Sequence, residues 1–265
     1  MIETDGPRAA YDGMAAVYDR FTAHHDYAAW TAALESLARA HGLSGRRLLD
    51  VGCGTGKSFL PFLARGYEVV ACDISPAMAA LAAAKAPAVP VHVHDARALP
   101  VLGEFDLVTC LDDCLNHLLT DEDLAAALAA MAANLAPDGL LLFDLNTLAT
   151  YRGFFAGASV VADDAAAIVW TGETDPRVGA GGRASARLVA FTPDGTGRWA
   201  RLDVVHVQRH HPEAAVRTAL AAAGLECVAR AGHGLDGVPH DGVDELSDTK
   251  AVYLARRARL TGEGR

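Results

Sequence analysis

The chain carries the stretch Leu48-Leu49-Asp50-Val51-Gly52-Cys53-Gly54-Thr55-Gly56, in which an apolar run ends in an acidic residue and glycines follow at alternate positions. Glycine there permits a tight turn from a strand into a helix and lets a ligand approach bare backbone. Such a turn at the carboxyl end of a parallel strand suits a nucleotide-like ligand. Asp50 narrows the choice, because a carboxylate beside the turn would repel a pyrophosphate and attract a cation.

The spacing of the glycines excludes two neighbouring nucleotide motifs. A Walker A loop needs a glycine five positions before Gly56-Lys57-Ser58, and that position is Val51. The dinucleotide fingerprint G-x-G-x-x-G needs a glycine at position 57, where this chain has lysine. We therefore expect neither a phosphate-cradling loop nor a nicotinamide or flavin site.

The pattern Asp-x-Gly-x-Gly-x-Gly resembles motif I of the class I S-adenosylmethionine-dependent methyltransferases, and the segments that follow agree with that family. Tyr67–Asp73 reads as a second strand ending in an acid, which can accept both hydroxyls of a ribose. Val91–Asp95 reads as a third strand, and the resemblance implies that its acid accepts the adenine amino group. Phe105–Leu111 resembles the fourth strand, whose end lies beside the transferable methyl in that family.

The resemblance implies S-adenosyl-L-methionine as the cofactor and covers residues 8–150 well, the remainder weakly. The implied fold is α/β, a doubly wound, seven-stranded, mostly parallel sheet with an antiparallel β insert. The expected cofactor-binding residues are Tyr18, Asp50, Gly52, Cys53, Gly54, Asp73, Ile74, Met78, Asp95, Ala96 and Leu111.

Composition limits the classes of partner. The net charge of −10 argues against nucleic acid, whose binding depends on neutralising phosphates, and no basic run or aromatic platform is present. The five cysteines make no CxxC pair and are expected to be small buried side chains in a reducing compartment. We expect no signal peptide, no membrane span and a cytoplasmic location. The sequence leaves the oligomeric state open between monomer and homodimer.

Hydrophobic periodicity divides the chain into three parts. Residues 1–42 are predicted to form a helical lid, because Tyr11, Met14, Tyr18 and Phe21 recur at helical spacing. Residues 43–147 and 212–257 are predicted to form the Rossmann-like cofactor domain. Residues 148–211 have the composition of hairpins, which predicts an antiparallel insert that caps the substrate.

Two local predictions concern helices of the cofactor domain. A helix is expected over residues 56–65, distorted by the proline inside it. A second helix is expected to bury Leu124, Leu128, Met131 and Leu135 on one face and to end at Pro137-Asp-Gly.

Methyl transfer from a sulfonium is an in-line displacement with an activated leaving group, so the protein mainly supplies proximity and orientation. The segment Leu111–Leu118 resembles that of the small-molecule N-methyltransferases, including those acting on amino sugars, in which a Tyr or His commonly precedes a Leu. His117 stands at that place, and could take a proton from an ammonium or hydroxyl group. A structural role for the same histidine stays open.

Tyr18 resembles the tyrosine that relatives place as a lid over the methyl donor, although it also lies on an apolar helical face. It is therefore a candidate for both catalysis and cofactor binding. Asp112 and Asp113 could attract an amine or cap a helix. The candidate substrate residues are Tyr11, Trp30, Asp112, Asn116, His206 and Arg209. The histidines show no recognised zinc spacing, and no metal is expected.

These features predict a methyltransferase that acts on a small molecule, with an amine nitrogen favoured over a hydroxyl oxygen. One alternative is non-methyl chemistry on the same fold, such as intramolecular cyclisation of S-adenosylmethionine or of an activated substrate. Another is a non-catalytic subunit that kept the fold.

Overall fold

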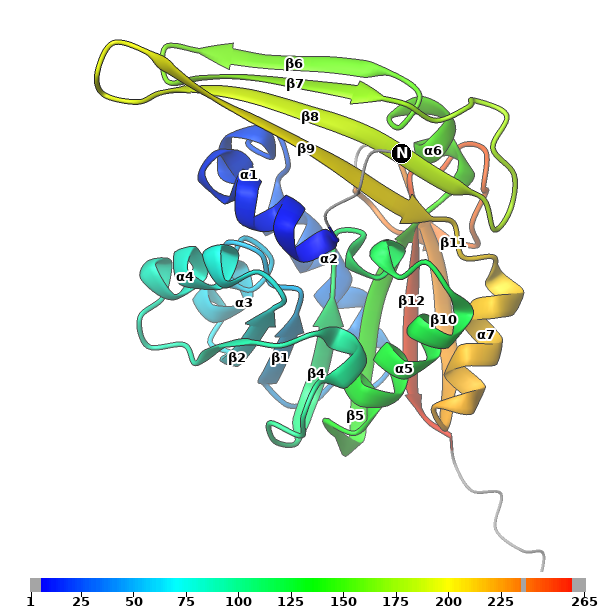
Figure 1. Ribbon diagram of the computed structural model, residues 1–265. Helices are drawn as coiled ribbons and strands as arrows, with labels where there is room; N and C mark the ends of the chain where they lie inside the picture. The colour runs from blue at the N-terminus through cyan, green and yellow to red at the C-terminus, as the bar shows by residue number, and fades with distance from the viewer. Residues whose placement is uncertain (1–5, 235–236, 259–265) are drawn as a thin grey trace, which may run out of the picture.

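The computed structural model describes residues 6–234 and 237–258, which form a central sheet flanked by helices and a second sheet above it (Figure 1). In the central sheet the strand order is β11-β10-β12-β5-β4-β1-β2-β3. The parallel strands β1 to β5 are Arg47–Val51, Glu68–Asp73, Val91–Val93, Phe105–Cys110 and Leu135–Asn146. The antiparallel edge consists of β10 Leu225–His233, β11 His240–Asp241 and β12 Lys250–Arg257.

Residues that alternate along the central strands enter two different hydrophobic cores. On one face, α5 (Asp121–Ala132) and α7 (Glu213–Ala222) pack on side chains such as Leu49, Val108 and Phe143. On the other face, α2 (Tyr27–Ala40) and α3 (Leu60–Ala64) pack on Leu48, Leu107 and Leu142. Burial on both faces explains why these strands read as continuous apolar runs.

The second sheet is antiparallel, with strand order β6-β7-β8-β9. Its strands are Ala158–Asp163, Ala166–Gly172, Arg183–Pro193 and Trp199–Arg209. Helix α1 (Pro7–Phe21) lies between this sheet and the central domain, and Met14 and Val17 share a core with Ile168 and Leu188 (Figure 1). The short helix α6 (Leu148–Gly153) leads into this sheet, and α4 (Pro76–Lys85) packs against α1.

The predicted fold class, a doubly wound and mostly parallel sheet with an antiparallel β insert, is confirmed. The two-residue strand β11 adds an eighth strand to the seven that were expected. None of the helices in the described part of the chain combines the length and hydropathy that crossing a bilayer requires.

The helix predicted over residues 56–65 is wrong in extent. Gly54 and Gly56 have positive φ angles of 53° and 91°, which a helix does not allow, so turns occupy the first part of this segment. The helix itself covers only Leu60–Ala64, and Pro61 stands in its first turn, where a missing N–H costs nothing.

The predicted end of the following long helix is also wrong. Helix α5 stops at Ala132, and Leu135 already belongs to β5. The segment Pro137-Asp-Gly lies within that strand, where the register against β4 shifts. A Cβ on Gly139 would lie 2.5 Å from the carbonyl oxygen of Phe105, so this close approach of two strands requires glycine.

Candidate active site

The glycines of the turn after β1 leave its backbone uncovered where it lines a cavity. The N–H groups of Gly52 and Cys53 donate to the carbonyl of Cys72, at 2.8 and 2.9 Å, which fixes the turn on the end of β2. Gly52 has a φ of 72°, and a Cβ there would lie 2.4 Å from the sulfur of Cys114. The turn therefore needs glycine and presents bare backbone.

Asp50 lies beneath the turn and does not line the cavity. Its carboxylate is 1% exposed and accepts hydrogen bonds from the hydroxyls of Ser58 and Thr109. Burial raises the pKa of Asp50 to about 6, against the opposing effect of those two hydroxyls. The carboxyl group thus stabilises the turn through buried hydrogen bonds and does not present its charge to a ligand.

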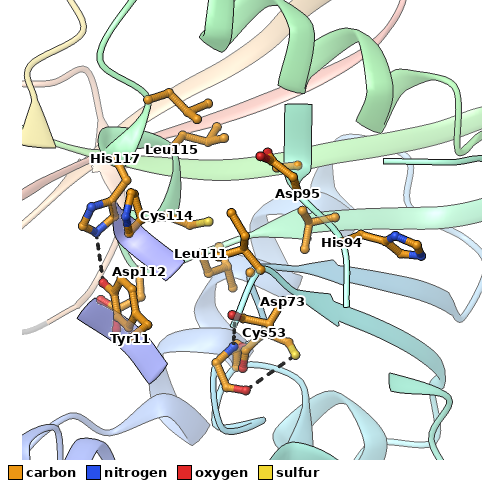
Figure 2. Close-up of a pocket in the computed structure, with 18 of the residues that line it drawn as sticks. Tyr11, Cys53, Asp73, His94, Asp95, Leu111, Asp112, Cys114, Leu115 and His117 are labelled. Atoms are coloured by element: carbon orange, nitrogen blue, oxygen red, sulfur yellow. Dashed lines mark hydrogen bonds between the residues drawn. The ribbon is translucent and has the colours of Figure 1, made fainter. Parts of the chain in front are cut away.

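A cavity of about 280 Å³ opens beside the turn, at the carboxyl ends of the parallel strands. Figure 2 shows Asp73 and Asp95 on one side of it and Tyr11 and His117 on the other. All the expected cofactor residues line it except Asp50 and Met78. Met78 is fully buried in the core that α4 shares with α1.

The two carboxylates at the cofactor side differ in their surroundings. Asp73 is 8% exposed, and accepts from the N–H groups of Gly54 and Ser75, each at 2.8 Å. Burial raises its pKa. Asp95 pairs with Arg97 at 2.6 Å, which lowers the pKa of Asp95. Asp73 keeps lone pairs for further donors, because a carboxylate offers about four acceptor sites. Asp95 already accepts from the backbone N–H and the guanidinium of Arg97 on both of its oxygens.

Tyr11 and His117 form a hydrogen-bonded pair on the opposite wall. The hydroxyl of Tyr11 lies 3.0 Å from Nε2 of His117, and Nδ1 of His117 lies 3.2 Å from the carbonyl oxygen of Val207. A carbonyl only accepts, so Nδ1 carries the proton and Nε2 presents a lone pair to Tyr11. Burial lowers the pKa of His117, which keeps the ring neutral at neutral pH.

The turn after β4 is held in an unusual conformation. Asp112 and Asp113 both have left-handed φ angles, 61° and 59°. Their N–H groups donate to the carboxylate of Asp144 in β5, at 2.6 and 3.1 Å. Such a conformation costs about 1–3 kcal/mol per residue, so it persists only where surrounding contacts hold it.

Asp112, Asp113 and Asp144 form a buried acidic cluster, and Lys250 neutralises part of its charge. Its ammonium lies 3.0 Å from Asp144, 3.6 Å from Asp112 and 4.0 Å from Asp113, and the residue is 8% exposed. Burial opposes the charge, but the attraction of the three carboxylates outweighs it and raises the pKa of Lys250. The lysine therefore stays charged inside the protein.

Side chains from helices α1 and α2 hydrogen-bond to the turn after β4. The hydroxyls of Tyr27 and Tyr18 donate to Asp112 at 2.5 and 3.4 Å. Lys57 donates to Thr22, and its ammonium lies 4.9 Å from the centre of the Tyr27 ring. These contacts place Tyr18, Tyr27 and Lys57 around one end of the cavity.

Five residues that build this region were not among the candidate site residues: Tyr27, Lys57, Asp144, Gln208 and Lys250. Gln208 donates to Asp113 at 2.9 Å and lies 3.3 Å from Nε2 of His117. For two of the five, the sequence contains a pattern that could have identified them. Asp144 interrupts the apolar run of β5, and Lys250 opens the apolar run of β12, and a charge in a buried strand needs a partner.

Four of the proposed substrate residues lie outside the main cavity. Trp30 is 3% exposed and packs on His25, Tyr27 and His233. Asn116 is buried and donates to the carbonyl of Arg209, whose own side chain pairs with Asp121. His206 lines a second, smaller cavity. Tyr11 and Asp112 line the main one, and the described residues contain no cluster fit for a metal ion.

Buried neutral histidines predict an acid-sensitive fold. Burial lowers the pKa of His211 to about 4, so the unfolded chain binds its proton at a higher pH than the folded one. The stability that the neutral ring contributes is complete above pH 6.5 and is lost as the pH falls toward 4, by about 1.4 kcal/mol per pH unit.

Replacing His211 by phenylalanine should flatten that decline by about this slope, measured by urea unfolding between pH 6.5 and 4. The exposed His24 gives the control, because His24→Phe should leave the slope unchanged. Parallel stability curves for His211→Phe and the parent would refute the prediction.

Comparisons with known proteins agree with this geometry. Residues 48–139 match the family model of a methyltransferase domain. A dTDP-3-amino-3,4,6-trideoxy-alpha-D-glucopyranose N,N-dimethyltransferase of Streptomyces venezuelae is 29% identical over 79% of this chain and 88% of its own length. The chain spans 48–64% of the length of the first curated relatives that it matches.

Solved structures resemble the whole described fold. An S-adenosylmethionine-dependent methyltransferase from Clostridium acetobutylicum has a TM-score of 0.77 at 22% identity, covering 94% of this chain and 99% of that one. The SAM-bound amino pentose methyltransferase CalS10 from Micromonospora echinaspora has a TM-score of 0.65 at 26% identity, covering 94% and 95%.

The fold is that of the class I S-adenosylmethionine-dependent methyltransferases, and the predicted resemblance is confirmed. Within that class, the chain is similar to small-molecule methyltransferases, several of which are named for amino-sugar substrates. The same matches support S-adenosyl-L-methionine as the cofactor.

Proposed function

We propose that the chain transfers a methyl group from S-adenosylmethionine to an amine nitrogen of a small molecule, in the class of amino sugars. One observation carries the proposal. A single cavity brings the glycine turn, Asp73 and Asp95 opposite a hydrogen-bonded Tyr11–His117 pair. The similarity to sugar N-methyltransferases supports the amine over a hydroxyl acceptor.

The residues of the cavity fit the cofactor. The bare turn at Gly52 and Gly54 allows a close approach, and Asp73 at the end of β2 has the position that accepts ribose hydroxyls in related folds. Asp95, two residues after the end of β3, would accept the adenine amino group. Bound there, S-adenosylmethionine would supply a methyl group activated by the positive charge on its sulfur.

The remaining residues orient the acceptor and take up its proton. An ammonium must lose a proton before its nitrogen can attack. Tyr11 lines the cavity, and its hydroxyl donates to Nε2 of His117. Tyr11 can accept the proton of the acceptor as it passes its own to His117.

Product analysis tests the proposed reaction. Incubation with S-adenosylmethionine and an amino sugar should yield S-adenosylhomocysteine and an N-methylated product, seen by mass spectrometry. Methylthioadenosine as the product would instead support cyclisation or aminocarboxypropyl transfer. Absence of cofactor binding in calorimetry would favour a non-catalytic subunit.

Four expectations from the sequence stay predictions. They are the three-part domain division, a cytoplasmic location, the absence of a nucleic-acid partner and an oligomeric state of monomer or homodimer.

Replacing Asp73 by alanine should weaken binding of S-adenosylhomocysteine by about 1.5–3 kcal/mol, the usual loss for a hydrogen bond to a charged group. Part of the loss would come from the N–H of Gly54, which would lose its acceptor. Calorimetry measures the change, and Asp138→Ala, an exposed carboxylate outside the cavity, is the matched control. Unchanged affinity in Asp73→Ala would contradict the ribose assignment.

A further inference from the structure

Strand β9 of the second sheet contacts both nitrogens of the His117 ring. Nδ1 donates to the carbonyl of Val207, and Nε2 lies near two polar side chains. The hydroxyl of Tyr11 is 3.0 Å from Nε2, and the amide nitrogen of Gln208 is 3.3 Å from it. Gln208 therefore reaches the atom at which the proton of the substrate amine would arrive.

The neighbours of Gln208 determine which end of its amide faces His117. The amide oxygen accepts from Nδ2 of Asn146 at 2.8 Å and lies 3.3 Å from the hydroxyl of Tyr151. The amide nitrogen donates to Oδ2 of Asp113 at 2.9 Å. A flipped amide would place its oxygen against a carboxylate and its N–H groups against another donor. The nitrogen therefore faces both Asp113 and His117.

Asp113 supplies a buried negative charge beside this histidine. Its Oδ2 accepts from Asn146 as well as from Gln208. Burial raises the pKa of Asp113, while Lys250 at 4.0 Å and the hydrogen bond from Gln208 oppose that rise. Oδ2 of Asp113 and Nε2 of His117 contact the same amide nitrogen, so they lie within about 6 Å of each other. At that range an opposite charge favours the protonated form of a histidine.

Two titratable side chains that pack on the His117 ring are neutral. The ring of Tyr11 meets it edge-on, with centroids 5.3 Å apart, and burial raises the pKa of Tyr11 well above its usual value. The ring of His206 lies 6.1 Å from it between centroids, and burial lowers the pKa of His206 to about 3. Neither side chain offers a negative charge to a protonated His117.

The charged groups near His117 come from the turn after β4 and from strands β5 and β12. Burial lowers the pKa of His117, Lys250 lowers it further, and Asp113 opposes both effects. Asp144 accepts from the N–H groups of the turn and pairs with Lys250, and Asp112 also lies close to that lysine. The carboxylate joined to His117 through one shared amide is therefore that of Asp113.

A proton that reaches Nε2 of His117 through Tyr11 changes this nitrogen from an acceptor into a donor. The hydroxyl of Tyr11 can then accept from it, because a phenol both donates and accepts. The amide of Gln208 cannot, but it keeps its hydrogen bond to Asp113. A positive ring in this buried place is costly unless a negative charge lies nearby.

Resting on the proposed function, we propose that Asp113 is the counter-charge that lets His117 become a cation during methyl transfer, and that Gln208 positions both side chains. Neither Asp113 nor Gln208 lines the main cavity, so both are positioning residues that act through His117. The second sheet thus takes part in the proton transfer, through the carbonyl of Val207 and the amide of Gln208.

Two substitutions that change charge and almost nothing else test the proposal. Asp113→Asn removes the negative charge, while asparagine keeps an oxygen for both donors and tolerates a left-handed φ. Gln208→Glu adds a negative charge at the shared contact and keeps an oxygen for Asn146. The histidine signals are titrated by NMR with S-adenosylhomocysteine bound. The signal that is missing in His117→Ala identifies the ring.

The two variants should shift the titration of His117 in opposite directions. It should move about one pH unit lower in Asp113→Asn and at least about one unit higher in Gln208→Glu. Asp138→Asn, an exposed carboxylate outside the main cavity, should leave it unchanged. An absent or upward shift in Asp113→Asn overturns the proposal, as does an absent or downward shift in Gln208→Glu. A merely structural role would change the melting temperature without these opposite shifts.

The titration needs no methyl transfer, so its result is independent of the proposed function. That function fails separately, if no N-methylated product forms from S-adenosylmethionine and an amino sugar. Where product forms, Asp113→Asn should lower turnover about tenfold, the equivalent of one pH unit, at parental affinity for S-adenosylhomocysteine. Parental turnover in Asp113→Asn would also overturn the proposal.

Discussion

Alanine in place of His117 is expected to lower turnover by about 10²–10⁴-fold, the usual contribution of a general base. The neutral ring presents Nε2 to Tyr11, while Nδ1 is fixed by the carbonyl of Val207. Alanine removes the final proton acceptor of the pair but leaves the cofactor side of the cavity unchanged. Binding of S-adenosylhomocysteine should therefore stay near that of the parent.

The pH profile separates a base from a structural side chain. Burial lowers the pKa of His117 below 6.5, so the parent should lose turnover only as the pH falls through that lowered value. His117→Ala should lack this acid limb. Tyr11→Phe removes the hydroxyl that connects the cavity with Nε2, and should lower turnover in the same direction. A loss of only a few-fold in His117→Ala, with the acid limb retained, would leave His117 a structural residue.

The residues that touch the backbone turn were predictable from sequence because local rules determine them. Gly52 and Gly54 need positive φ angles, and Asp73 is the last residue of its strand, so short-range patterns place the turn and this carboxylate at one edge of the sheet. Asp50 shows the limit of that reasoning. Its motif position was recognised, but the direction of its side chain depends on Ser58 and Thr109.

The acceptor side could not be predicted from local patterns, because distant segments build it. His117 is held by Val207, and Asp112 by Tyr27, 90 and 85 residues away in the chain. The same holds for Lys250, which pairs across the antiparallel edge of the sheet with Asp144. The order of the strands brings these residues together, and no spacing in the sequence encodes it.

The largest loss of stability is expected when Lys250 is replaced by methionine. Methionine keeps much of the volume of the side chain but leaves Asp112, Asp113 and Asp144 without their buried counter-charge. Breaking a buried ion pair by removing one partner typically costs about 3–5 kcal/mol. Urea unfolding should show this loss at an unchanged m-value.

Two further variants decide whether charge is the cause. Lys250→Met combined with Asp144→Asn removes one of the uncompensated carboxylates, and should recover part of the lost stability. Recovery should be incomplete, because Asp144 also accepts from the N–H groups of Asp112 and Asp113, and an asparagine offers a single acceptor oxygen to both. The exposed pair Arg177–Asp175 supplies the control, because solvent screens this ion pair and Arg177→Met should leave the free energy of unfolding near that of the parent.

Cofactor binding gives the Lys250 variant a second readout. The cluster holds Asp112 and Asp113 in left-handed conformations at the edge of the cavity, and Leu111 directly before them lines it. Lys250→Met should therefore also weaken binding of S-adenosylhomocysteine under conditions where the variant is still folded. A variant as stable as Arg177→Met, with parental cofactor affinity, would show that Lys250 neither offsets the buried carboxylates nor holds the turn.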